Sequence, residues 1–299
     1  MERMSAAALV VAWVLDACFG ETPNAVHPVA WLGRLLGPVG RRLCGWQPAA
    51  ALVGGTLAWL VMAAGLVRAC AWLQAELATW PWWLGALALG CVLKPCFAWR
   101  MLRDEVAAVE LALGQSLQAG RERVARLASR DVSRLQACEV REAAIETLAE
   151  NLNDSVLAPL FWFVLGGLPA AALYRFANTA DAMWGYRGRY EWAGKFAARA
   201  DDVLSWIPAR LSALLICPSP RCWAGMRGQA SLTPSPNGGW PMGAMALRLG
   251  VRLRKPGVYA LNARAASPGP LHSAQALRIA TRAAWLAMLA ALLACAWSR

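Results

Sequence analysis

The chain has 299 residues, of which 58% are hydrophobic and only 16% charged, and its net charge is +12. Soluble domains carry roughly 25% charged residues. The composition therefore argues against a soluble protein and favours an all-α, polytopic membrane protein with cytoplasmic helical and loop regions. The arginines are dispersed, without a basic stripe interleaved with aromatic residues, which argues against nucleic-acid binding. Anionic substrates remain compatible with the charge.

Cysteine usage argues against a metal–thiolate centre. The nine cysteines include no C-x-x-C pair, and most lie in apolar or helical surroundings. We interpret them as reduced, small, buried hydrophobic residues.

The first three apolar segments of the chain are predicted to lie in the membrane as ordinary helices. The first, residues 6–15, is followed at once by Asp16 and has no small-residue cleavage site, so we interpret it as a retained membrane segment rather than a signal peptide. Residues 49–73 and 82–99 form a predicted transmembrane hairpin. Its tip contains Glu76 and no Lys or Arg, whereas arginines precede and follow the pair, which places the tip outside and the open end in the cytoplasm.

Residues 100–210 form the predicted catalytic region, partly cytoplasmic and partly embedded in the membrane. Helical periodicity over 106–117 predicts a helix that Gly120 ends, with a second helix starting near Arg121. The apolar stretches 157–173 and 203–217 contain prolines and are flanked by arginines. We therefore predict that they are re-entrant, interfacial or packed against other helices rather than crossing the bilayer. Residues 218–270 are predicted to be a loop region and 274–297 a C-terminal membrane helix of a single domain.

An acidic row is the strongest chemical signal. Glu142, Glu146, Glu150 and Asp154 recur every four residues, beside Asn151, which on a helix places the carboxylates about 5–6 Å apart. A solvated helix face is the alternative, but the row runs directly into an uncharged apolar stretch. Oxygen-only clusters suit Mg²⁺, and acidic groups close to a membrane carry a solvation cost that favours a functional role.

Two further polar clusters follow. Asn178 and Asp181 share a helix face before a predicted helix stop at Gly185-Tyr186-Arg187. Arg199 precedes the adjacent acids Asp201 and Asp202, and Arg210 lies in the next apolar run. These residues suggest an acidic site with an internal counter-ion. The alternative is a structural pair between Arg210 and Asp202.

Two loops complete the candidates. His27 lies between Pro23 and Pro28, in a rigid loop that can hold a site. The run Ser235-Pro-Asn-Gly-Gly exposes backbone N–H groups to which a phosphate can come close, although it is also an ordinary turn sequence.

Five blocks, in order over nearly the whole chain, resemble the CobD/CbiB family, the adenosylcobinamide-phosphate synthases of cobalamin biosynthesis. They are FGETPNAVHPVAWLGRLL, REAAIETLAENLNDSVLAPLFW, YRFANTADAMWGYRGRY, ARADDVLSWIPARL and SPNGGWPMGAMALRLGVRL. The family pattern has a His shortly before Ser235, where this chain has Ser231 and Thr233 nearby, and glycines at the positions where this chain has Lys255-Pro256.

The resemblance implies a ligase that uses ATP and Mg²⁺. It would join a carboxylate of adenosylcobyric acid to the amine of aminopropanol or its O-phosphate, through an acyl phosphate. The implied catalytic residues are Glu146, Glu150, Asn151, Asp154, Asp181, Asp201 and Asp202, with Glu146, Glu150 and Asp154 as metal ligands. Implied substrate or phosphate contacts are His27, Arg34, Asn178, Tyr186, Arg187, Arg199, Arg210, Asn237 and Gly238.

The same resemblance implies a bacterial inner-membrane, multi-pass protein with its active site on the cytoplasmic side. Its expected partners are the two substrates and the lipid bilayer, and a second copy or other membrane enzymes of the pathway are further candidates. A non-catalytic membrane sensor, as in the distantly related AmpE family, and a corrinoid carrier are the alternative functions.

Overall fold

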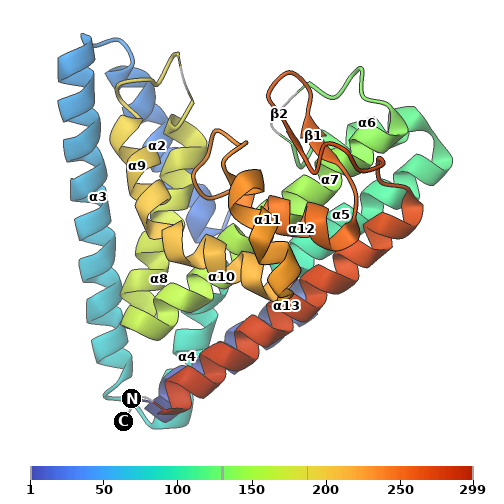
Figure 1. Ribbon diagram of the computed structural model, residues 1–299. Coiled ribbons are helices and arrows are strands. Elements are labelled where there is room, and N and C mark those ends of the chain that lie inside the picture. The colour runs from blue at the N-terminus through green and yellow to red at the C-terminus, as the bar shows by residue number, and fades with distance from the viewer. Residues whose placement is uncertain (1, 129–130, 187, 298–299) are drawn as a thin grey trace. The chain divides into compact units, whose positions relative to one another are not determined.

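The computed structural model describes residues 2–128, 131–186 and 188–297, and nearly all of its regular structure is helical (Figure 1). The helices of the first half are α1 (Glu2–Phe19), α2 (Pro28–Leu43), α3 (Pro48–Leu77), α4 (Trp82–Leu93), η1 (Lys94–Cys96), α5 (Trp99–Gln115), α6 (Leu117–Val124) and α7 (Ala137–Leu152). Those of the second half are the π-helical turn η2 (Asn153–Leu157), α8 (Ala158–Trp184), α9 (Lys195–Leu204), α10 (Trp206–Ile216), α11 (Pro220–Ala230), α12 (Gly239–Leu249) and α13 (Pro270–Trp297). The predicted all-α class is confirmed.

Four helical runs in the described part of the chain are long and apolar enough to cross a membrane, which makes this a multi-pass membrane protein. They are Pro48–Leu77, Trp82–Gln115, Ala137–Trp184 and Pro270–Trp297. Helix α10 has 11 residues, or roughly 16 Å at 1.5 Å per residue, and is too short to cross a hydrocarbon core of about 30 Å. The run Ala137–Trp184 has the length and composition of a span, so the predicted re-entrant course of 157–173 stays a prediction.

The chain divides into two compact units, a division that the predicted single domain did not include. One contains Met1–Ala98, Ala158–Ser205 and Leu289–Arg299, and the other contains Trp99–Leu157 and Trp206–Met288. The predicted catalytic region 100–210 is therefore shared between them, with its acidic row in the second unit.

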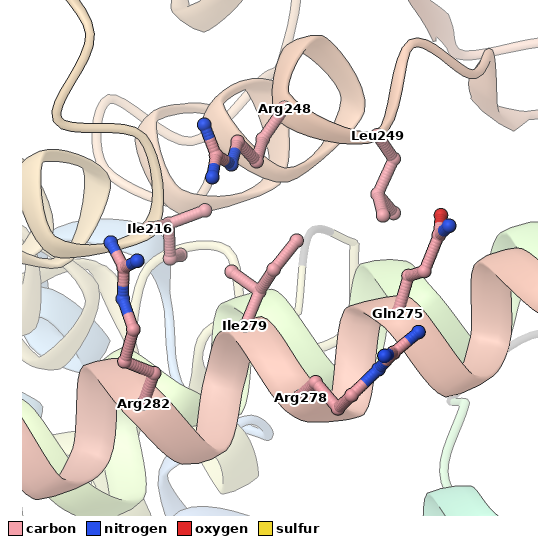
Figure 2. Close-up of a pocket in the computed structure, with 7 residues that line it drawn as sticks. All are labelled: Ile216, Arg248, Leu249, Gln275, Arg278, Ile279 and Arg282. Atoms are coloured by element: carbon pink, nitrogen blue, oxygen red, sulfur yellow. The ribbon is translucent and has the colours of Figure 1, made fainter.

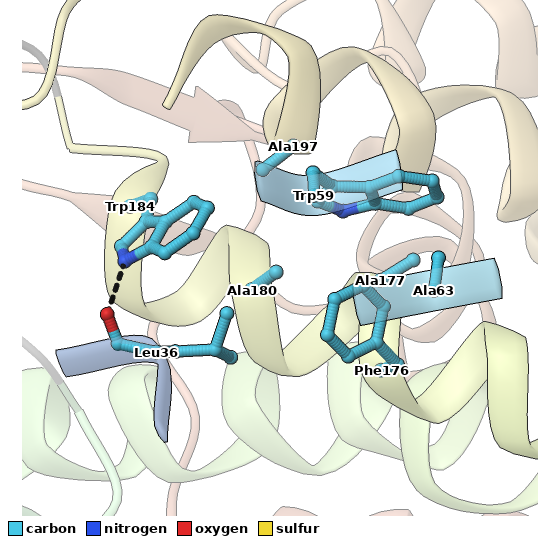
Figure 3. Packing of buried hydrophobic residues seen from close by; sticks show 8 residues of the cluster. All are labelled: Leu36, Trp59, Ala63, Phe176, Ala177, Ala180, Trp184 and Ala197. Carbon is cyan, nitrogen blue, oxygen red and sulfur yellow. Dashed lines mark hydrogen bonds between the residues drawn. The ribbon is translucent and has the colours of Figure 1, made fainter. Parts of the chain in front are cut away.

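The first unit is held together by a core in which α2, α3, α8 and α9 pack closely (Figure 3). Trp184 is almost fully buried and its indole N–H donates to the carbonyl of Leu36 at 3.2 Å. The Trp59 ring packs on Phe176 and on Phe196 at centroid distances of 5.4 and 5.1 Å. Small residues such as those at 177, 180 and 197 allow the helices to approach this closely.

Helix α8 is kinked at two glycines. Gly167 has φ +65°, a conformation that only glycine adopts without strain. The kink takes the N–H of Leu168 out of the helical ladder, and the side chain of Gln74 on α3 accepts it at 2.7 Å. A polar residue in a membrane helix thus satisfies a backbone group that lipid would leave unsatisfied.

A buried cluster of ion pairs lies in the same unit and joins the segment between α1 and α2 to η1. Lys94 is only 5% exposed and pairs with Glu21 at 2.6 Å and Asp16 at 3.5 Å. Glu21 also contacts His27, whose other ring nitrogen accepts the N–H of Val29 and caps α2. A lysine that is buried in the protein is tolerated here because two carboxylates lie beside it.

The second unit differs from the predictions in three places. The break near Gly120 lies at Ser116 instead, because the Ser116 hydroxyl caps α6 by accepting the N–H of Ala119, and Gly120 lies inside that helix. The predicted loop region contains α11 and an antiparallel hairpin of β1 (Leu253–Lys255) and β2 (Tyr259–Leu261). Short elements of this kind carry too few residues for their periodicity to be recognised.

One pair of cysteines corrects the interpretation that all nine are reduced. Cys217 and Cys222 form a disulfide with their Cα atoms 6.3 Å apart. The sharp turn between α10 and α11 brings two residues that are close in sequence into the range that a disulfide requires.

Candidate active site

The acidic row does not lie in one environment. Glu142 is fully buried and ion-paired with Arg252 and Arg254, at 3.3 and 3.4 Å. Glu146 is also buried, Glu150 is exposed, and Asp154 is half-buried. Only the last two carboxylates are therefore open to a ligand that arrives from solvent.

Asp154 lies in the π-helical turn η2. The wider winding of this turn means that four residues no longer bring Asp154 onto the same face of the helix as the other acids of the row. Turns of this kind occur frequently at functional sites. The side-chain amide of Asn153 donates to Asp154 at 2.8 Å, and the hydroxyl of Ser212 on α10 donates to Asn153 at 2.9 Å. These two buried contacts fix the orientation of the Asp154 carboxylate.

The Ser-Pro-Asn-Gly-Gly run leads into α12, which begins at its last glycine, Gly239, and it lies beside the end of α7. The hydroxyl of Ser235 accepts the N–H groups of Asn237 and Gly238 at 3.2 and 3.1 Å. A Cβ atom at Gly238 would lie 3.1 Å from Oε1 of Glu150, so glycine allows the carboxylate to approach the helix N-terminus. This geometry brings together two predicted residues that are far apart in sequence.

Arg210 is held beside the same loop. Its guanidinium donates to Asn237 at 2.8 Å and lies over the rings of Trp206 and Trp240, at 4.3 and 4.7 Å from their centroids. Asn237 is only 5% exposed, so it orients the arginine more readily than it contacts a substrate. An always-charged, planar group fixed by two indoles and an amide is suited to contact an anion.

The remaining residue of this group, Asn151, donates its side-chain amide to the carbonyl of Thr147, one turn back on α7, at 3.1 Å. The second unit therefore contains Glu146, Glu150, Asn151, Asp154, Arg210, Asn237 and Gly238 of the predicted site.

The other predicted site residues belong to the first unit. Asn178 and Asp181 lie on α8, both half-buried, and α8 ends at Trp184, just before the predicted stop. Tyr186 is exposed. Arg187 lies outside the described residues, so nothing follows for its predicted role.

Helix α9 carries the two adjacent acids. Arg199 pairs with Asp202 at 3.4 Å, so this acid has a basic partner on its own helix. Burial raises the pKa of the Asp202 carboxyl above its usual value, and Arg199 opposes this shift. Asp201 is half-buried on the same helix.

The N-terminal candidates have structural contacts in the first unit. Both ring nitrogens of His27 are engaged, one by Glu21 and one by the start of α2. Arg34 is exposed and donates to the carbonyl of Asn24 at 3.2 Å. These contacts engage both ring nitrogens of His27 and so give the histidine a structural role.

The described residues contain no group of three or more His, Cys, Asp or Glu side chains close enough to hold a metal ion. Mg²⁺ needs fewer protein ligands than such a group, because it keeps several waters and is commonly bound by one or two carboxylates together with substrate phosphates. The open carboxylates of Glu150 and Asp154 fit that arrangement. The assignment of Glu146, Glu150 and Asp154 as metal ligands stays a prediction.

Sequence reasoning gave no supporting role to the residues that hold this site in place. Ser235 and Asn153 orient its loop and its carboxylate, and Arg252 neutralises the first acid of the row. Asn153 and Ser235 stand within the quoted blocks, where an adjacent polar residue was a usable signal. The partnership of Arg252 with Glu142 joins positions 110 residues apart, and no local pattern indicates it.

Fold and site together define a class: a multi-pass helical membrane protein in which carboxylates, an anchored arginine and a glycine-rich helix start are grouped in one unit. The profile of the family described as CobD/Cbib protein matches residues 9–287, and the chain belongs to this family.

Curated relatives are similar in sequence to this chain over most of their lengths. A probable cobalamin biosynthesis protein CobD of Pyrococcus abyssi is 40% identical over 84% of this chain and 83% of its own. The cobalamin biosynthesis protein CobD of Rhodobacter capsulatus is 38% identical over 98% of both chains. A probable CobD of Thermococcus kodakarensis is 38% identical over 93% of this chain and 90% of its own. No solved structure matches the chain.

Proposed function

We propose that this protein acts in cobalamin biosynthesis as an ATP-dependent amide ligase. It would join a carboxylate of adenosylcobyric acid to the amine of aminopropanol or aminopropanol O-phosphate. The family supports the pathway, and the close approach of the Glu150 carboxylate to Gly238 at the start of α12 is the observation that supports the chemistry. A carboxylate, a helix N-terminus and a fixed guanidinium on neighbouring elements are the parts that a phosphoryl-transfer site needs.

The reaction requires an activated acid, because a free carboxylate does not react with an amine at a useful rate. The substrate carboxylate would attack the γ-phosphorus of ATP, forming an acyl phosphate and releasing ADP. The amine would then attack the acyl carbon, phosphate would leave with the electron pair of the C–O bond, and the nitrogen would lose a proton. Both steps build negative charge on phosphate oxygens.

The residues of the second unit have roles in this scheme that follow from their contacts. Arg210 would contact a phosphate oxygen, since its guanidinium is charged and is held by Trp206, Trp240 and Asn237. The N-terminus of α12 would favour negative charge at Gly238 and Gly239. Bound Mg²⁺ would screen the phosphates, and Glu150 and Asp154, with Glu146 behind them, are the residues that would hold it.

The test uses the purified full chain in detergent with adenosylcobyric acid, ATP, Mg²⁺ and either amine. The expected result is a product heavier than the acid by the amine minus one water, formed with ADP and phosphate. Absence of product with both amines would exclude the ligase. Corrinoid binding without product would instead favour the carrier, and neither binding nor product would favour the membrane sensor.

A further inference from the structure

A second basic site lies in the second unit, away from the candidate active site. A cavity of about 410 Å³ is lined by Arg248 of α12 and by Arg278 and Arg282 of α13. Arg278 and Arg282 are four residues apart and so share one face of α13. Figure 2 shows Arg282 and Ile279 extending from α13 toward Ile216 of α10. Arg248 lies at the opposite end of α12 from Gly238, roughly 15 Å along the helix.

The three guanidinium groups lack the usual counter-ions. Several other arginines of this unit are paired with acids, as Arg141 is with Glu110 at 2.7 Å. Within the described residues, Arg248, Arg278 and Arg282 form no ion pair with a carboxylate. Three like charges around one cavity repel one another, and an anion in the cavity would relieve that repulsion.

The walls between the arginines are apolar. Ile216, Leu249 and Ile279 line the same cavity. A small inorganic anion gains nothing from such walls, whereas an amphiphile can place its charged group on the arginines and its hydrocarbon on the aliphatic side chains.

The position of the arginines along α13 indicates how deep the site lies. Helix α13 is one of the runs able to cross the membrane. Beyond Arg282 its exposed side chains are apolar, beginning with Trp285 and Leu286, which are 56% and 40% exposed, and ending at Trp297. That stretch is roughly 22 Å long, most of the hydrocarbon core. Arg282 therefore falls near the level at which lipid phosphates lie, and tryptophan is enriched at the same interface.

We propose that this cavity binds the phosphate headgroup of an anionic membrane phospholipid. The arginines would contact the phosphodiester, and the acyl chains would run along the exposed apolar face of α13 from Trp285 onward. Such a lipid would supply the negative charge that the second unit lacks at this place, and it would hold α10, α12 and α13 together. This site is independent of the ligase reaction and of its substrates.

The test measures lipid binding to the purified full chain in a neutral detergent by native mass spectrometry. Phosphatidylglycerol is compared with phosphatidylcholine at equal concentration, and inorganic phosphate is added in a separate arm. The unchanged chain should retain phosphatidylglycerol in preference to phosphatidylcholine. The double variant Arg278→Gln, Arg282→Gln should lose this preference by about tenfold or more, as expected for the loss of charge-assisted hydrogen bonds.

Two control variants test whether a loss of phosphatidylglycerol binding comes from the cavity itself rather than from a lower net charge or from misfolding. Arg264→Gln removes an exposed arginine of the same unit that does not line the cavity, and should bind phosphatidylglycerol as the unchanged chain does. Arg282→Lys keeps the charge and should retain most of the preference. If the double variant does not fold, as judged by circular dichroism, Arg248→Gln on the other helix should give the same loss. Equal binding of both lipids to the unchanged chain, unchanged binding in the Gln variants, or displacement of the lipid by inorganic phosphate would overturn the proposal.

Discussion

Four acidic side chains with the same spacing in the sequence meet different surroundings on α7 and η2. Glu142 and Glu146 are buried, whereas Glu150 is exposed and Asp154 is half-buried. A buried carboxylate paired with two arginines serves packing, and an open carboxylate beside a helix N-terminus can serve a ligand. Substitutions within the row should therefore affect different properties.

Glu150→Gln and Asp154→Asn should each lower the rate of amide formation by about 100-fold or more, since each removes charge from the proposed phosphate and metal site. Neither should shift the thermal unfolding transition much, because neither carboxylate is buried. Product formation by mass spectrometry and unfolding followed by circular dichroism give the two readouts. Glu122→Gln is the matched control, since Glu122 is an exposed helical glutamate hydrogen-bonded only to Gln118, one turn away, at 2.9 Å. Full activity in both site variants would remove these carboxylates from the mechanism.

The contact between α7 and the β1–β2 hairpin is the clearest stabilising feature at the level of elements. Arg252 bonds both Glu142 and Ser267, and Arg254 bonds Glu139 at 2.6 Å. Arg252 donates two hydrogen bonds to the fully buried Glu142. Removing Arg252 leaves that carboxylate with the ion pair to Arg254 at 3.4 Å and without these hydrogen bonds.

Arg252→Met should therefore destabilise the second unit by about 1–3 kcal/mol, the cost of a buried polar group that loses its hydrogen bonds, and lower the unfolding temperature in detergent. Arg252→Met combined with Glu142→Gln should recover part of this loss, because the second change removes the buried charge that has lost the hydrogen bonds of Arg252. Arg103→Met is the control, since the pair of Arg103 with Asp104 is largely exposed and such pairs contribute little. If the single variant unfolds like the unchanged chain, the buried pair has no structural role.

The sequence predicted the long elements better than the short ones. The apolar run 49–73 became α3, and the stop at Gly185 matches the end of α8, because hydrophobic length and helix-ending residues are local signals. The hairpin, α11 and the Cys217–Cys222 bond were missed, since each depends on contacts or turns that few residues encode. Gly120 misled because the Ser116 cap provided a better helix start four residues earlier.

The site shows the same division. The acidic row and the glycine-rich run were visible separately, but the approach of Glu150 to Gly238 required the packing of α7 against α12. The even spacing of the row was also deceptive, because the π-helical turn at 153–157 changes the winding just before the last acid. Spacing predicts a shared face only while the helix keeps 3.6 residues per turn.

At the scale of the whole molecule, the distribution of arginines predicts which loops face the cytoplasm. The turn between α3 and α4 contains no Lys or Arg, whereas the segment after α8 carries Arg189 and Lys195 and the segment after α6 carries Arg126. Because cytoplasmic loops are enriched in Lys and Arg, the first should lie outside and the other two inside.

The run Ala137–Trp184 makes this prediction informative. If it crossed the bilayer once, the loops before α7 and after α8 would lie on opposite sides, although both are basic. The kink at Gly166–Gly167 and the turn η2 both interrupt regular winding in this run, and such breaks allow a segment to return to the side from which it entered. We therefore expect both loops on the cytoplasmic side.

Reporter fusions test this arrangement directly in cells. Alkaline phosphatase, active only outside the cytoplasm, should be active when fused at Thr79 and inactive at Leu127 and Trp192, and a green fluorescent protein that folds only in the cytoplasm should give the reverse pattern. The Leu127 and Trp192 fusions are matched controls for each other, because they bracket the single run whose course is in question. Opposite signals at these two positions would show that Ala137–Trp184 crosses the membrane once. The basic segment after α8 would then lie outside the cytoplasm. This result would exclude the predicted role of Arg199, Asp201 and Asp202 in a cytoplasmic site.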